Sequence, residues 1–593
     1  MGTEGSASGR WASTAFLGLL AVVAAVAAAC SSSTPSGGSG AAAGPGSAPA
    51  STNTAPPVEL NFVFGSEKKD WLTDEIQRFN TAVHVTPSGH PIVVKGFARG
   101  SGEAVSDIVS QRVQADVFAP ASSMYIDVVN RAWTEKSGAL GGGSTGGIGG
   151  IAKDGKSLAV TPVVIGMWKP MAQALGWPAK PIGWSDLLTL AQDPKGWATL
   201  GHAEWGHLKF GHTHPELSNS GHLGILAEAY ATTGMTRGLT VGHVDAPPVL
   251  EALRKIEGAV VHYGKSTGFF ADKMLTRGPR YLSAAVLYEN LVVQSYLKPD
   301  YQNREMDLVA IYPKEGTFWI DNPFLVLDTP WMTDDKRAAA KSLLETLLAR
   351  DAQERAMTLY GFRPAEPSVA VGAPIDAAHG VDPKQPQTLL DLPPREVLDE
   401  VLKIWRQAKK GVDVYFVFDK SGSMAGEPLV QARQGAEAFV DMLDPRDRLS
   451  LVLFDHRVPE KIDAPVAMEQ GRADIKQRLD ATFADGGTAM YDSVLAAFRA
   501  ASAAAEKEPG RNHAIVVLTD GKDENSSGTL DALIAALGTS GEVETTVRLF
   551  TIAYGNAADP AILAKIAEAG RGGAFTGDPK NIQQVYQDLA AFF

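Results

Sequence analysis

The chain has few of the residues that cross-link a protein or ligate a metal through sulfur. It holds one cysteine, Cys30, in 593 residues. No intramolecular disulfide can form, and zinc or iron–sulfur sites built from several cysteines are excluded. Positive charge is also scarce, because the formal net charge is −13. An acidic balance of this size argues against binding along a nucleic-acid phosphate backbone.

No zinc-protease helix of the H-E-x-x-H type occurs in the sequence, and no set of catalytic residues is recognised in it. We therefore expect a protein that binds rather than catalyses. The length still predicts several domains, at roughly 100–200 residues each. The hydrophobic fraction of 45% is sufficient for ordinary cores.

Long apolar runs are few, and one of them lies near the N-terminus. Residues 16–29 are continuously apolar and end directly before Cys30. This length suits the core of a signal peptide and is short for a membrane span. Residues 31–57 carry no charge and are rich in Gly, Ser, Ala and Pro. Such a segment cannot bury a core and is typical of a flexible spacer.

This N-terminal segment resembles a bacterial lipoprotein signal, in which the cysteine is acylated and becomes the mature N-terminus. The resemblance implies a signal peptide over 1–29, a linker over 30–57 and a lipid on Cys30. It also implies a location at the extracytoplasmic face of the cell membrane, where two acyl chains would hold the protein stably. Ala27 departs from the pattern, because a larger aliphatic residue is usual there. Secretion after cleavage at an A-x-A site and an uncleaved anchor helix remain as alternatives.

One pattern repeats three times after the spacer. Strand-like segments are followed by turns rich in Gly and Ser and then by amphipathic helices; the strands are 58–64, 91–97 and 115–118, and the first two helices are 70–82 and 103–112. This order predicts an α/β fold with parallel strands. Each turn places hydroxyls and backbone N–H groups at a helix N-terminus, an arrangement that binds anions or polar ligands.

These turns resemble those of bacterial extracellular solute-binding proteins, close to the molybdate and sulfate binders. The similarity rests on the segments GSEKKDW, RGSGEA, ADVFAPASSMY, LAVTPVVIGMWKP, ALGWPAKPIGWSDLL, KFGHTHPELSNSGH and AAVLYENL. It implies a periplasmic-binding-protein-like module with two lobes over 58–365, hinge strands near residues 160 and 320, and a ligand in the cleft between the lobes.

The resemblance also implies which residues line that cleft. The positions carried over are Ser66, Ser101, Ser122, Ser123, Ser220 and Tyr288. The alternative role for each serine is that of a helix N-cap, which is common for serine after a strand. The ligand would be an oxyanion or a small metabolite, and the sequence does not name it.

Histidines are concentrated in the predicted second lobe. Of the 12 in the chain, five lie within 21 residues: His202, His207, His212, His214 and His222. His212 and His214 would share one face of a strand, a spacing that suits a metal ion. We favour histidines that bond to the backbone, because no metal-binding motif accompanies them. A metal-dependent enzyme that uses this cluster remains a further alternative.

Residues 366–410 join the two halves of the chain. Proline recurs through 363–387, which predicts an extended connector. Residues 395–409 then show an apolar stripe at helical spacing. We expect this helix to dock against one of the domains.

The most specific motif lies in residues 411–593. A buried-strand pattern at 411–418 ends in the D-x-S-x-S sequence of residues 419–423. Further strand patterns at 448–454, 513–518 and 547–553 alternate with helices. This alternation predicts a doubly wound, Rossmann-like α/β sheet with its ligand chemistry at the carboxyl ends of the strands.

These elements resemble a von Willebrand factor type A domain with a complete metal-ion-dependent adhesion site. The resemblance implies that the metal is held by Asp419, Ser421, Ser423, Thr488 and Asp520. Mg²⁺ prefers oxygen ligands in octahedral geometry, and these side chains supply carboxylates and neutral hydroxyls. An open position on the ion would then accept a carboxylate from a protein partner. We interpret residues 522–525 as a solvated loop beside the site, with a tuning role for Asp523 as the alternative.

The negative charge of the chain gathers on this last domain. Residues 411–593 contain 27 acidic and 17 basic residues, a net −10 out of −13. This balance suits a domain that holds a divalent cation and disfavours acidic polymers as partners. The leading hypothesis is a membrane-anchored binding or adhesion protein of the cell envelope that uses Mg²⁺. The alternative is a solute receptor for an ABC-type transporter, with the C-terminal domain in a docking or regulatory role.

Overall fold

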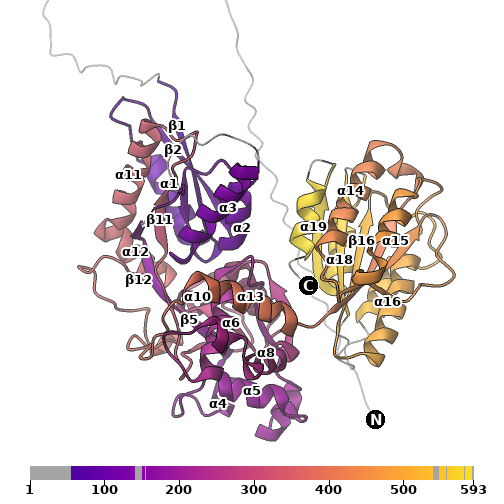
Figure 1. Ribbon diagram of the computed structural model, residues 1–593, viewed down its shortest axis with the longest axis horizontal. Coiled ribbons are helices and arrows are strands. Elements are labelled where there is room, and N and C mark those ends of the chain that lie inside the picture. The colour runs from indigo at the N-terminus through magenta and orange to yellow at the C-terminus, as the bar shows by residue number, and fades with distance from the viewer. Residues whose placement is uncertain are drawn as a thin grey trace, which may run out of the picture. The chain divides into compact units, whose positions relative to one another are not determined.

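The computed structural model describes residues 55–139, 150–153, 155–538, 547–555, 557–579 and 581–590. The predicted signal peptide, Cys30 and nearly all of the spacer lie outside these residues. No helix of the described segments is both long enough and apolar enough to cross a membrane. The described chain forms three β-sheets, each packed against helices (Figure 1).

The first sheet forms the core of the first lobe, with strand order β2-β1-β3-β11-β4. Its strands are β1 (Val58–Gly65), β2 (Ile92–Arg99), β3 (Val117–Ala119), β4 (Lys156–Ser157) and β11 (Pro323–Val326). Its helices are α1 (Lys69–Thr81), α2 (Ser101–Val109), α3 (Tyr125–Ala139), α11 (Asp334–Leu348), α12 (Arg350–Tyr360) and the short η1 (Ser66–Lys68). The three predicted strands are parallel, and β11 runs antiparallel to β3. Alternate residues of β1 face two separate apolar clusters, with Phe62 on one side and Val63 on the other.

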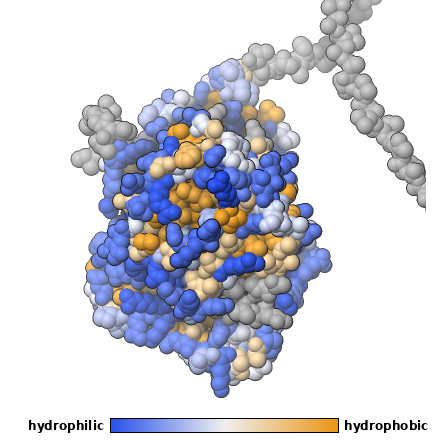
Figure 2. Space-filling view, turned by 90° about the vertical axis from the view of Figure 1, so that its right-hand side faces the viewer, coloured by the Kyte–Doolittle hydropathy of each residue, from blue (hydrophilic) through white to orange (hydrophobic). Residues whose placement is uncertain are grey.

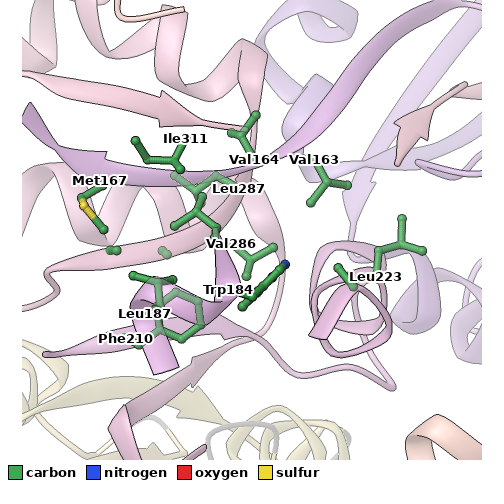
Figure 3. Close-up of a cluster of buried hydrophobic side chains, with 14 of the residues drawn as sticks. Val163, Val164, Met167, Trp184, Leu187, Phe210, Leu223, Val286, Leu287 and Ile311 are labelled. Carbon is green, nitrogen blue, oxygen red and sulfur yellow. The ribbon is translucent and has the colours of Figure 1, made fainter. Parts of the chain in front are cut away.

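The second sheet forms the core of the second lobe, with order β10-β5-β8-β6-β7, while β9 and β12 also pair with β5. Its strands are β5 (Ala159–Trp168), β6 (Phe210–Thr213), β7 (Val260–Gly264), β8 (Ala284–Tyr288), β9 (Leu308–Ile311), β10 (Trp319–Ile320) and β12 (Arg363–Pro364). Its helices are α4 (Lys169–Ala174), α5 (Trp184–Gln192), α6 (Asn219–Thr233), α7 (Val241–Val244), α8 (Pro247–Ala259), α9 (Thr267–Arg277) and α10 (Glu289–Leu297). Side chains from β5, α5, β6 and β8 fill its centre (Figure 3). The chain passes from one sheet to the other between β4 and β5, and again between β10 and β11.

The segment after the second lobe is extended, but it is not a free connector. Ile375, Val381 and Leu390 are buried in the same apolar core as the second lobe. The backbone N–H of Ala310 donates to the carbonyl of Gly380 at 2.8 Å. The prolines therefore predicted the lack of regular structure but not the packing of this segment on the lobe.

Helix α13 (Arg395–Ala408) packs on the second lobe. Its buried apolar stripe, which includes Val401, Ile404 and Trp405, contacts α6, α7 and α8. The hydrophobic pattern predicted both this helix and its docking against a domain. The helix ends one residue before the predicted Lys409.

The third sheet belongs to the C-terminal domain, with order β15-β14-β13-β16-β17-β18. Its strands are β13 (Val412–Asp419), β14 (Arg448–Phe454), β15 (Val466–Ala467), β16 (Asn512–Thr519), β17 (Val547–Tyr554) and β18 (Arg571–Gly577). Its helices are α14 (Glu427–Met442), α15 (Met468–Asp480), α16 (Met490–Lys507), α17 (Leu530–Gly538), α18 (Pro560–Ala569), α19 (Ile582–Ala590) and the short η6 (Gly422–Met424). All pairs are parallel except β14 with β15.

Both faces of this third sheet are covered by helices. Every residue of β13 is buried, with Phe416 in one apolar cluster and Val417 in the other. A strand covered on both faces is mostly apolar, and residues 414–418 of β13 are all apolar or aromatic. The predicted α/β fold class, a two-lobed binding-protein-like module followed by a doubly wound domain, is confirmed.

Candidate functional site

The predicted metal-site residues lie at the carboxyl edge of the third sheet. Asp419 ends β13, and Asp520 directly follows the end of β16 at Thr519. Strand β13 lies between β14 and β16, and the chain continues to β14 on one side of it and returns as β16 on the other. Ligands of open α/β sheets bind at such a switch in strand order.

The structure brings the five predicted residues together. The hydroxyl oxygens of Ser421 and Ser423 are 3.1 Å apart, and Ser423 donates to Oδ1 of Asp520 at 2.7 Å. Oδ1 of Asp419 accepts the backbone N–H of Ser421 at 2.8 Å. Thr488 joins from the loop before α16, close to Gly521, where a Cβ would lie 3.1 Å from the Thr488 hydroxyl and 3.7 Å from that of Ser423. The absence of a side chain at residue 521 therefore keeps this edge open.

Burial raises the pKa of both carboxylates in this group. It raises the pKa of Asp419 to about 6, against the opposing effect of hydrogen bonds from Thr519 and Ser421. Burial also raises the pKa of Asp520. The nearby ammonium of Lys420 does not compensate for these charges, because it pairs with Asp455. Two partly desolvated carboxylates and three hydroxyls therefore form a donor set that fits a small divalent cation.

The site contains few strong charges for a metal centre. Within the described segments, no group of three or more His, Cys, Asp or Glu side chains could hold a metal ion. The set at the sheet edge has two carboxylates, and its other oxygens are neutral hydroxyls. A cation there would keep much of its charge for an external ligand.

Two residues that support the site escaped the sequence analysis. Thr519 donates to Oδ2 of Asp419 at 2.5 Å, and Oδ1 of Asn525 accepts the backbone N–H of Thr488 at 2.9 Å. Asp523 accepts the N–H of Tyr491 at 2.8 Å. Lys522, Glu524 and Asn525 are exposed, as expected for a solvated loop, but the loop also positions Thr488 through Asn525. Its Asn and Asp side chains, which often bond to backbone in turns, were the available signal.

An exposed aromatic residue lies beside the site. Phe483 is 70% exposed, and the ammonium of Lys420, within the D-x-S-x-S motif, lies 5.8 Å from its ring centroid. Figure 2 shows one face of the molecule, on which hydrophilic residues predominate and hydrophobic residues form separate patches. A large exposed ring next to a binding site is a candidate partner contact.

The serines predicted to line the cleft are engaged within the protein. The Ser66 hydroxyl accepts the N–H of Gly268 from the other lobe at 3.0 Å. The Ser101 hydroxyl accepts the N–H of Ala121 at 3.1 Å, and that of Ser122 accepts the N–H of Met124 at 3.3 Å. The backbone N–H of Ser123 donates to Asp321 at 2.9 Å.

The two remaining cleft positions are fully buried. Ser220 shares hydrogen bonds with the hydroxyls of Thr213 and Thr267, at 2.9 and 2.8 Å. The Tyr288 hydroxyl accepts from Nδ2 of Asn219 at 3.0 Å, and burial holds the pKa of Tyr288 well above its usual range. No side-chain cap bond forms at the N-termini of η1, α2 or α6, so the N-cap alternative does not describe Ser66, Ser101 or Ser220.

The helix N-terminus of α2 is bonded to the opposite lobe. The backbone N–H groups of Gly102 and Glu103 both donate to the carbonyl of Leu217, at 3.0 and 3.1 Å. A Cβ on Gly102 would lie 2.1 Å from the carbonyl oxygen of Glu216. The N–H groups expected to bind an anion are thus used between the lobes.

The five histidines do not converge on one point. His202 stacks on Trp205 with ring centroids 3.9 Å apart, and His207 is exposed. His212 bonds to the carbonyl of Thr213 at 2.8 Å and to Glu257 at 2.9 Å. His222 bonds to the carbonyl of Leu398 at 3.3 Å. The backbone N–H of Glu216 donates to Nδ1 of His214 at 3.4 Å. Bonds to backbone, as favoured from the sequence, therefore account for three of the five.

Three of these histidines lie under α13. The ring of His214 packs edge-on against Trp405 with centroids 4.9 Å apart, and the Trp405 indole donates to Glu257 at 3.0 Å. Burial lowers the pKa of His214 and lowers that of His222 to about 4. These side chains form part of the surface on which α13 packs, called here the seat of α13.

Comparisons with known proteins identify both halves of the chain. Residues 109–383 match the family model of the bacterial extracellular solute-binding proteins, and residues 413–588 match that of the von Willebrand factor type A domain. An uncharacterized protein of Synechocystis sp. is 30% identical over 179 residues, which are 30% of this chain and 40% of that protein. The chain therefore spans less than half the length of that relative.

Solved structures resemble each half separately. A periplasmic thiamin binding protein is 14% identical with a TM-score of 0.42, covering 61% of this chain and 99% of its own. A von Willebrand factor type A protein from Catenulispora acidiphila is 25% identical with a TM-score of 0.26, covering 31% of this chain and 42% of its own. The chain joins a bacterial extracellular solute-binding protein domain to a C-terminal von Willebrand factor type A domain.

Proposed function

We propose that the C-terminal domain binds Mg²⁺ and, through the ion, a carboxylate of a protein partner. The observation that carries this proposal is the gathering of two carboxylates and three hydroxyls at one open sheet edge. Asp419, Ser421, Ser423, Thr488 and Asp520 would hold the ion. The ion supplies an electrophilic position for an oxygen ligand of the partner. This is binding chemistry, and we propose no catalytic step.

The metal is tested by titrating Mg²⁺ into the full chain in a calorimeter. Asp419→Ala should abolish the binding heat, because it removes one of the two carboxylates. Asp474→Ala is the matched control, because Asp474 is an exposed acid on α15. EDTA and Asp419→Ala should each prevent capture of envelope partners by the immobilised chain. Capture that survives both treatments would contradict the proposal.

We also propose that Cys30 carries a lipid that anchors the protein at the extracytoplasmic membrane face. The sole cysteine directly follows the apolar run of residues 16–29, which supports this assignment. Cys30→Ser should move the protein from the membrane to the soluble fraction and remove the acyl mass. Membrane retention without any acyl mass would favour the uncleaved anchor helix.

A second candidate function is that of a solute receptor, and two buried acceptors favour it. Oδ1 of Asn219 and Oδ1 of Asn290 are buried without a hydrogen-bond partner. Asn290 bonds across the lobes to the carbonyl of Glu67 at 3.4 Å, which places it at the cleft. Unpaired acceptors favour a solute that donates hydrogen bonds over an oxyanion.

A thermal-shift panel tests this receptor function. A ligand that binds only the folded chain raises its melting temperature. A rise with polyols or amines, and none with sulfate or molybdate, would support a donor-bearing solute. No rise with any compound of the panel would reject the receptor function.

A further inference from the structure

A cavity of about 570 Å³ opens beside the contact between the lobes. It is lined by α2 and α3 of the first lobe, by the segment before α6 of the second lobe, and by α13. Its volume is within the range of small-molecule sites. It adjoins the bonded N-terminus of α2, because Gly102 and Glu216, which meet at that contact, both line the cavity.

One wall of this cavity comes from a helix that neither family match covers. Helix α13 begins at Arg395, after the solute-binding match ends at residue 383 and before the other match begins at residue 413. It contributes Arg395, Leu398, Asp399, Leu402 and Arg406 to the lining. The cavity is therefore a property of this chain, in which α13 is docked.

The floor of the cavity is apolar. Val105 and Val109 of α2 and Val128 of α3 face it together with Leu398 and Leu402 of α13. A hydrated inorganic ion would leave these side chains without contacts. An occupant with an apolar body removes their surface from water, at about 25 cal/mol per Å².

The rim of the cavity offers positive charge. Nη1 of Arg395 is buried without a hydrogen-bond partner, although its Nε donates to Asp399 at 2.9 Å. Arg406 is paired with Glu216. Lys136 also lines the cavity, is exposed, and has no partner within the described residues. A guanidinium with a free buried donor prefers a carboxylate.

We propose that this cavity binds an amphipathic carboxylate whose head contacts Arg395 and Lys136 and whose chain lies on the valine and leucine floor. These contacts come from α2 and α3 of the first lobe and from α13, which packs on the second lobe. Ligand binding stabilises the arrangement in which the lobes are closed and α13 is docked.

Calorimetric titration of the full chain with decanoate tests the proposal. Decanoate should bind saturably, whereas acetate and decyltrimethylammonium should not, because each lacks one of the two features. Arg395→Gln should weaken decanoate binding at least tenfold, and Val109→Trp should abolish it by filling the cavity. The control Arg350→Gln removes a charge from an exposed i,i+4 pair of α12 and should leave the affinity unchanged.

Folding of the variants is checked by circular dichroism and by their thermal unfolding. Failure of decanoate to bind the unaltered chain would overturn the proposal. Equal binding of the decyl ammonium, or undiminished binding by well-folded Val109→Trp, would overturn it as well.

Discussion

Two regions of the molecule share one local arrangement, a strand followed by a turn that contains serine and glycine. They are the metal-site edge of the C-terminal domain and the cleft of the two-lobed module. At the end of β13 the hydroxyl oxygens of Ser421 and Ser423 lie 3.1 Å apart, and Ser423 is exposed. In the cleft, the N–H groups at the start of α2 bond to the other lobe. The same local sequence pattern therefore leads to an available site or to an internal contact, depending on what the tertiary fold places opposite it.

The largest expected effect is a loss of unfolding free energy in acid, and it should distinguish the two halves of the chain. His222 is buried and neutral under α13, and its pKa is lowered to about 4 from an ordinary 6.5. The unfolded chain binds this proton first, so stability is lost as the pH falls from 6.5 towards 4. The free energy of unfolding falls by about 3 kcal/mol over this range.

Calorimetric unfolding at pH 7 and pH 4.5 measures this loss. His222→Gln keeps a side-chain N–H for the carbonyl of Leu398 and should reduce the loss. His207→Gln should not, because His207 is exposed. An equal acid loss in His222→Gln and the unaltered chain would show that the seat of α13 is not acid-sensitive through this residue.

The next effect concerns the closed lobes. Gly102→Ala places a Cβ about 2 Å from the Glu216 carbonyl, so the lobes must separate locally. We expect a loss of about 2 kcal/mol and faster hydrogen exchange of the N–H groups at 102 and 103. Gly258→Ala on α8 is the control, because nothing lies within 4 Å of its Cβ. Unchanged exchange in Gly102→Ala would mean that the lobes are already open in solution.

A smaller effect tests whether the hydrogen bond from Thr519 orients Asp419 for the metal ion. Thr519→Val removes the hydrogen bond to Oδ2 of Asp419 while keeping the side-chain volume. The carboxylate loses its orientation, and Mg²⁺ affinity should fall about tenfold, the loss typical of removing a supporting bond around a metal ligand. Ser502→Ala on α16 is the control, because the Ser502 hydroxyl has no hydrogen-bond partner. An unchanged Mg²⁺ affinity in Thr519→Val would show that this hydrogen bond does not orient Asp419 for the ion.

The sequence predicted the metal-site edge of the C-terminal domain better than the contacts in the cleft. The alternation of strands with helices and the D-x-S-x-S motif predicted the sheet and the grouping at its edge, because parallel neighbouring strands end at the same edge of a sheet. The partners of Ser66 and of the Gly102 N–H could not be predicted, because Gly268 and Leu217 are distant in sequence and are brought close only by the packing of the lobes. The packing of 366–392 on the second lobe was missed for the same reason.

The smallest effect on the domain itself should come from Phe483→Ser. The ring is 70% exposed and lies outside the metal-site group, so unfolding free energy should change by less than about 0.5 kcal/mol. Mg²⁺ affinity should also be unchanged, because no oxygen near the ion is altered. Partner capture alone should fall if the partner contacts this ring beside the metal. Loss of Mg²⁺ binding in Phe483→Ser would instead show that this loop shapes the metal site, so that the two properties cannot be separated there.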